Sequence, residues 1–129
     1  MTTFKTFEDI EAWQKARNLT REIYVVSNLG SFSKDYGLRD QIRRAGVSIM
    51  SNIAEGFERG GTREFVQFLS MAKGSSGEVR SQLYVSVDQR YIDKDTFEQL
   101  FKLATETSRM IAGLMNYLRK SKLKGSKYK

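Results

Sequence analysis

The stretch LRDQIRRAGVSIMSNIAEGFERGGT, residues 38–62, decides the fold, because two rows of apolar side chains in it follow the spacing of one long α-helix. A helix at a protein surface needs only one such stripe. We therefore expect a central helix that contacts several neighbours. Gly60-Gly61 should end it, and Thr62 should cap the next helix. The two rows are Leu38, Ile42, Ala45, Ile49 and Ile53, and Val47, Met50, Ala54 and Phe57.

Three further segments carry helical spacing, so the sequence predicts an all-α protein. The first helix is expected over about residues 7–28, with Thr6 and Asp9 as a capping box. Ser33 should cap the helix that holds the central stretch, with Asp35 in its first turn. Long helices joined by short turns are typical of an antiparallel up-down-up-down four-helix bundle. We assign residues 1–120 to this bundle and residues 121–129 to a basic C-terminal tail.

The third helix is expected to run from the glycine pair to Gln89, through Gly74-Ser75-Ser76-Gly77. Helical spacing continues on both sides of these small residues, which favours an unbroken helix. Two glycines would destabilise such a helix by about 2 kcal/mol relative to alanine. We therefore expect another backbone to pack closely there. The alternative is a break in the helix at residues 74–77.

The fourth helix begins at Asp93, a predicted N-cap, and its apolar residues cover a wide arc. The arc is roughly 160°, whereas a single bundle core needs roughly 100°. A second partner for this face is therefore predicted, and self-association into a homo-oligomer is the simplest source. The residues expected at the oligomer interface are Leu100, Leu103, Met110, Leu114 and Tyr117.

Several classes of chemistry are excluded by residues that the chain lacks. It has no histidine and no cysteine, which excludes disulfides, thiol catalysis and the Glu-x-x-His pairs of di-iron bundles. Glu55 and Glu58 could hold a hard cation, but Glu55 is better placed to pair with Arg59 four residues later. We expect no metal, no cofactor and no enzymatic activity. With no signal peptide and no apolar run of about 20 residues, we expect a cytoplasmic protein.

The net charge of +7 is concentrated at the C-terminus. The last 11 residues contain six basic side chains and no acid, whereas the preceding 118 carry 16 basic and 15 acidic side chains. Such a tail is typical of an arm that binds a polyanion, although a merely solubilising terminus is the alternative. The residues predicted to contact nucleic acid here are Arg119, Lys120, Lys122, Lys124 and Lys127.

A second basic cluster lies in the central helix, where Arg39, Arg43 and Arg44 occur within six residues. A guanidinium group suits phosphate because it can donate two parallel hydrogen bonds. Asp40 lies within one turn, so a structural ion-pair network is the alternative. Asn52 is expected to be a buried residue that fixes the register between helices. The aromatic residues that continue apolar rows are expected in the core rather than as base-stacking platforms: Trp13, Tyr24 and Phe57.

The blocks GLRDQIRRAGVSIMSNIAEGFERG (residues 37–60) and EFVQFLSMAKGSSGEVRSQL (residues 64–83) resemble the four-helix-bundle proteins encoded in intervening sequences of bacterial 23S rRNA genes. The segments IEAWQKA (residues 10–16) and MIAGLMNYL (residues 110–118) agree with this. The resemblance implies an antiparallel bundle that assembles into a ring, by similarity a homopentamer. It also implies kinship with the accessory variability determinant of diversity-generating retroelements, a pentameric barrel that binds nucleic acid and a reverse transcriptase.

Two positions depart from the family pattern. Relatives have proline where this chain has Met50, and again where it has Ser33. We therefore expect a straighter central helix and a looser turn before it. Two functions are predicted: an accessory protein that binds RNA or DNA through the tail and the arginine cluster, or a scaffold for a protein partner such as a reverse transcriptase.

Overall fold

The computed structural model describes residues 4–124, with side chains described up to Ser121. Helices are the only regular secondary structure in this described part, and no strand occurs in it, so the predicted all-α class is confirmed. Four α-helices are preceded or separated by two short 3-10 helices: η1 (Phe7–Asp9), α1 (Glu11–Ser27), η2 (Gly30–Lys34), α2 (Tyr36–Glu58), α3 (Thr62–Asp88) and α4 (Lys94–Lys124).

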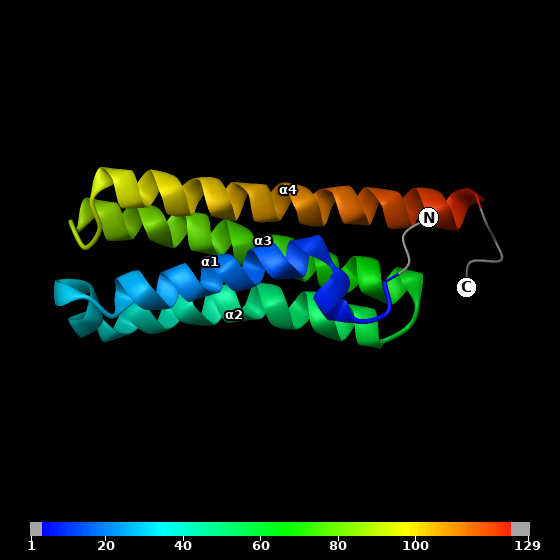
Figure 1. The fold of residues 1–129 in the computed structure, drawn as a ribbon, viewed down its shortest axis with the longest axis horizontal. Helices are drawn as coiled ribbons and strands as arrows, with labels where there is room; N and C mark the ends of the chain where they lie inside the picture. Colours follow the sequence, from blue (N-terminus) through cyan, green and yellow to red (C-terminus); the bar gives the residue numbers. More distant parts are fainter. Residues whose placement is uncertain (1–3, 125–129) are drawn as a thin grey trace.

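The four long helices lie side by side along the long axis of the molecule (Figure 1). Each packs against two others: α2 against α1 and α3, and α4 against α3 and α1. The first apolar row of α2 is buried between them as predicted, and Ile42, Ile49 and Ile53 are 0% exposed. The second row is only partly covered, because Val47 is 41% exposed. The central helix therefore buries one full face and only part of the next.

Helix α3 continues without a break through residues 74–77, which confirms the unbroken alternative. The close contacts there come from the two serines rather than the glycines. The hydroxyl oxygens of Ser75 and Ser48 are 2.9 Å apart, and Ser76 Oγ donates to the Ala104 carbonyl at 3.0 Å. A Cβ added to Gly74 would meet nothing within 4 Å. Within residues 74–77 the contact with another backbone is therefore made by Ser76, at the Ala104 carbonyl of α4, and not by Gly74.

Three predicted helix starts are corrected by the structure. Asp9 Oδ2 accepts a hydrogen bond from the Thr6 amide at 3.2 Å, but this cap belongs to the short η1. Helix α1 starts only after Ile10, whose backbone is extended. Asp35, not Ser33, caps α2, because its carboxylate accepts from the Leu38 amide at 3.1 Å. Gly61 precedes α3, so Thr62 is its first residue and not its cap.

The cap of α4 is confirmed, since Asp93 Oδ1 accepts from the Thr96 amide at 2.8 Å. This hydrogen bond lowers the pKa of Asp93. The turn before α2 has Ser33 where the resemblance implied a proline. It forms η2, which buries Phe32 completely, and Ser33 Oγ donates to the Gly30 carbonyl at 2.6 Å. Helix α4 is described as far as Lys124, so it runs past residue 120, the last residue assigned to the bundle from the sequence.

The side chains expected at the oligomer interface are more covered than predicted. Leu100 is only 3% exposed and belongs to the core, so it is removed from the expected oligomer interface. Leu103, Met110 and Leu114 are partly buried against the core, and Tyr117 is also partly buried. The large apolar side chains that are exposed in the described residues come from α1 to α3 and their flanking turn: Tyr24, Val25, Leu29, Tyr36, Val47, Met71, Tyr84 and Val85. In the described part of the chain, no helix is both long and apolar enough to cross a membrane.

Candidate nucleic-acid interface

Arg39 is held by its own surroundings at the start of α2. One terminal nitrogen donates to the Ser33 carbonyl at 3.0 Å, and Nε lies 3.3 Å from Asp40 Oδ1. Its guanidinium carbon is 4.8 Å from the centre of the Tyr36 ring. These contacts tie η2 to α2. Of the two alternatives for the arginine cluster, Arg39 therefore fits the structural one.

Arg43 connects α2 to α1. Its Nε donates to the hydroxyl of Ser27 at 2.8 Å, and Ser27 is fully buried. Its guanidinium carbon also lies 4.6 Å from the centre of the Tyr24 ring. Tyr24 was expected in the core but is 43% exposed, because it lies at the edge of the contact between the two helices. Arg43 is thus a positioning residue that holds Tyr24 beside α2.

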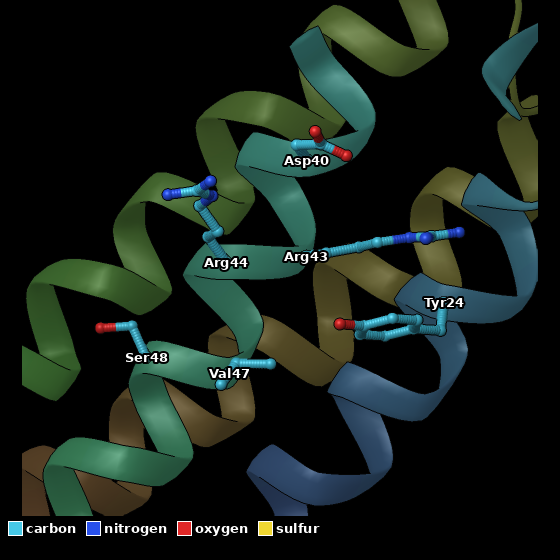
Figure 2. Close-up of a pocket in the computed structure, with 6 residues that line it drawn as sticks. All are labelled: Tyr24, Asp40, Arg43, Arg44, Val47 and Ser48. Carbon is cyan, nitrogen blue, oxygen red and sulfur yellow. The ribbon is translucent and has the colours of Figure 1, made fainter. Parts of the chain in front are cut away.

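Arg44 is the arginine of the cluster that is exposed and free. It makes no hydrogen bond or ion pair with the residues that the structure describes. Figure 2 shows Arg43 extending over Tyr24 toward α1, whereas Arg44 extends to the other side of α2, toward α3. The two side chains diverge, so they cannot close on one phosphate as a pair. The predicted cluster therefore contributes one available cation, Arg44.

Arg44 borders two open grooves, one on each side of α2. The groove toward α1 has a volume of about 540 Å³ and is drawn in Figure 2. It is lined by Tyr24, Asp40, Arg43, Arg44, Val47 and Ser48. The groove toward α3 has a volume of about 380 Å³. Its lining is Gln41, Arg44, Ala45, Ser48, Glu78 and Gln82. The first groove has the more basic lining, with two arginines against one aspartate that already pairs with Arg39.

Asn52 does not itself cross between helices. Its amide donates to the carbonyl and hydroxyl oxygens of Ser48, one turn earlier on α2, at 2.9 and 3.1 Å. Ser48 then makes the contact to Ser75 on α3. The predicted register-fixing role belongs to the serine pair, and Asn52 orients one member of it.

The tail residues that the structure describes lie far from the arginine cluster within one chain. Arg119 and Lys120 are exposed on α4. Lys122 and Lys124 continue that helix, with side chains outside the described set, and Lys127 lies outside the described residues. The described end of α4 and the start of α2 lie at opposite ends of the long axis (Figure 1). The two predicted patches are therefore separate surfaces of a single subunit.

No metal-ligating cluster of three or more acidic, histidine or cysteine side chains occurs among the described residues. Glu55 instead pairs with Arg59 at 3.0 Å, as the four-residue spacing predicted. No pattern in the sequence marked Tyr24 and Val47 as groove residues. Both continue apolar rows, and spacing alone does not reveal that a row ends at an open groove.

The sequence model of the 23S rRNA-intervening sequence protein family matches residues 8–113. A crystal structure of a protein of unknown function from the S23 ribosomal protein family of Bacteroides thetaiotaomicron VPI-5482 has a similar fold. The TM-score is 0.74 at 22% identity, over 81% of this chain and 95% of that one. No curated protein matches the sequence.

Proposed function

The chain belongs to the 23S rRNA-intervening sequence protein family, and from that premise we propose that it is a non-enzymatic accessory protein that binds RNA or DNA. The observation that carries the proposal is that both predicted basic patches hold exposed cations with no hydrogen bond or ion pair to the described residues. These are Arg44 beside α2 and Arg119 and Lys120 at the end of α4. Phosphate backbones attract such cations without regard to sequence, and binding releases counterions.

Assembly into a ring is part of the same proposal. Within one chain the arginine groove and the tail are far apart, so one subunit would hold nucleic acid weakly at either place. Five tails in a homopentamer would bring about 30 positive charges to one particle, and such multivalency strengthens weak arms. The partly buried side chains of Leu103, Met110, Leu114 and Tyr117 remain the proposed subunit contact, without Leu100. We place the protein in the cytoplasm.

An antiparallel up-down-up-down order of the helices is the arrangement we propose for each subunit. The short connections support it, because only residues 59–61 separate α2 from α3 and only residues 89–93 separate α3 from α4. Short connections join antiparallel neighbours in helical bundles. The order would place all basic tails on one rim of a ring.

A protein-interaction scaffold, for example for a reverse transcriptase, is the second candidate. The exposed apolar side chains of α3 favour it, since Met71, Tyr84 and Val85 are 49%, 52% and 44% exposed. Large apolar patches on a surface commonly mark a protein contact. In this case α3 would contact the partner protein, and the basic tail would only increase solubility.

A salt-titrated binding assay on the full-length chain separates the two candidates. The test variant replaces Arg119, Lys120, Lys122, Lys124 and Lys127 by glutamine, which keeps helix propensity similar. The matched control replaces five exposed cations elsewhere by glutamine: Arg21, Arg63, Lys73, Lys94 and Lys102. Solution mass is measured for all three proteins.

We expect wild type to bind RNA or DNA with an affinity that falls steeply with salt. The tail variant should lose at least tenfold in affinity at low salt, and the control variant much less. An equal loss in both variants would show that total charge, not the tail, matters. Absence of binding to any nucleic acid at low salt would leave the scaffold as the better reading.

A further inference from the structure

We propose that the groove between α1 and α2 binds one unpaired nucleotide of single-stranded RNA, a proposal that rests on the proposed nucleic-acid function. The groove combines exposed aromatic and aliphatic surface with a free cation at its border. Tyr24 is 43% exposed and Val47 is 41% exposed, and both lie along the groove with Arg44 (Figure 2). This combination is what recognition of a splayed-out base with its phosphate requires.

Arg43 positions the aromatic side of the groove, and contacts with α1 hold Arg43 itself. The hydrogen bond from Arg43 to buried Ser27 and its contact with the Tyr24 ring set the position of that ring. A prearranged platform lowers the entropy lost when a ligand binds. The volume of about 540 Å³ falls in the ~300–1,000 Å³ range of small-molecule sites. A single nucleotide is therefore a ligand of suitable size.

The divergence of the two arginines favours a single strand over a duplex. A duplex offers phosphates at its outer surface and would gain most from arginines that point the same way. Here Arg43 is turned onto Tyr24, and Arg44 alone remains for a phosphate (Figure 2). The exposed apolar surface between them would gain nothing from a duplex, because paired bases stay stacked within it. An unpaired base can leave its stack and cover Val47.

Asp40 favours RNA over DNA as the strand. Its carboxylate lines the groove, where it can only accept hydrogen bonds. The ribose 2′-hydroxyl offers a donor at every nucleotide, whatever the base, and DNA lacks it. Asp40 pairs with Arg39 through Oδ1 at 3.3 Å, which leaves Oδ2 without a partner among the described residues.

The test compares full-length variants against labelled single-stranded RNA, single-stranded DNA and duplex RNA of equal length. Val47→Glu places a negative charge in the groove. Val85→Glu is its matched control, because Val85 is also a helical valine with similar exposure, 44% against 41%. Arg44→Gln removes the free cation, and Arg21→Gln is its control on an exposed position of α1. Circular dichroism and solution mass accompany each variant.

We expect V47E and R44Q to lower affinity for single-stranded RNA at least fivefold, and V85E and R21Q less than twofold. Single-stranded RNA should outcompete the other two ligands, and Asp40→Asn should reduce the preference over DNA. Ultraviolet crosslinking of wild type to RNA should label the tryptic peptide of residues 22–34, which contains Tyr24.

Equal effects of V47E and V85E would overturn the proposal, as would equal competition by duplex or by DNA. A smaller solution mass for V47E alone would also overturn it, since the groove would then be a subunit contact. The outcomes above can be told apart from failure of the proposed nucleic-acid function. If that function fails, wild type binds none of the three ligands at low salt. That result would overturn both proposals.

Discussion

A Cβ on Gly56 would lie 2.6 Å from the Cβ of Phe68, so α2 and α3 approach as closely as they do because residue 56 has no side chain. The same atom would lie 3.0 Å from Cδ1 of Phe65. We expect Gly56→Ala to destabilise the protein by about 1–3 kcal/mol through overpacking, despite the better helix propensity of alanine. Urea unfolding followed by circular dichroism would measure this. An unchanged or higher midpoint would show that the helices can separate without loss.

Gly74→Ala is the opposite case, because open space surrounds that position on α3. Alanine should then stabilise the helix by up to about 1 kcal/mol. The same urea experiment measures it, with G56A as the comparison. Destabilisation by G74A would mean that a second chain packs on this glycine, and a fall in solution mass would identify that chain as another copy.

These two glycines show what the sequence could predict about the fold and what it could not. The spacing of α2 predicted its buried row correctly, because the period of a helix is fixed by geometry. The same reasoning placed the close approach of backbones at residues 74–77, since glycines in a helix need a reason. The structure leaves Gly74 open, and the tight glycine contacts are at Gly46, against the Thr20 side chain, and at Gly56, against the Phe68 side chain. Which glycine meets a neighbour depends on the rotation of each helix, and spacing within one helix does not contain that information.

Arg43 and Arg44 should respond differently to substitution. Arg43→Gln removes a hydrogen bond to buried Ser27 and a contact with the Tyr24 ring. Bonds that involve a charged group contribute about 1.5–3 kcal/mol and an exposed cation–π contact about 0.5–1. After allowance for partial exposure, we expect a loss of about 1–3 kcal/mol in the free energy of unfolding.

Arg44→Gln should change that free energy by less than about 0.5 kcal/mol, as expected for an exposed side chain without partners in the described chain. Thermal and urea unfolding of both variants measure the contrast. Equal stability losses would show that Arg44 is structural, and its assignment to a binding surface would then fail.

The candidate site was only partly predictable for the same reason. The three arginines were identified from their chemistry, but their neighbours decide their roles. Arg39 and Arg43 reach carbonyl and hydroxyl groups on η2 and α1, which lie six and 16 residues earlier in the chain. Tyr24 continues an apolar row and was therefore predicted in the core. In the structure it lies at the exposed edge of the α1–α2 contact, where the Arg43 guanidinium lies over its ring.

The link between Tyr91 and Asp35 predicts a change of stability in alkaline solution. The Tyr91 hydroxyl donates to Asp35 Oδ2 at 2.9 Å, and its ring stacks on buried Phe32. The hydrogen bond to Asp35, then burial and the carboxylate's charge, raise the pKa of Tyr91 above its ordinary value of 10.0. Folding therefore favours the neutral phenol. Its contribution should be fully present below pH 10 and should be lost as the pH rises through the folded-state pKa.

Tyr91→Phe removes this contribution at every pH, so wild type should melt at a higher temperature than Y91F between pH 7 and 9, and the difference should shrink above pH 10. Tyr84→Phe is the control, because the Tyr84 hydroxyl makes no hydrogen bond to the described residues and its ring is 52% exposed. Wild type and Y91F differ at this position alone, so other effects of alkaline pH cancel in the comparison. A wild-type advantage that stays constant through pH 11 would show that the hydrogen bond does not depend on the phenol proton. The same advantage in Y84F would assign the effect to tyrosines in general rather than to the contact that ties the α3–α4 turn to the cap of α2.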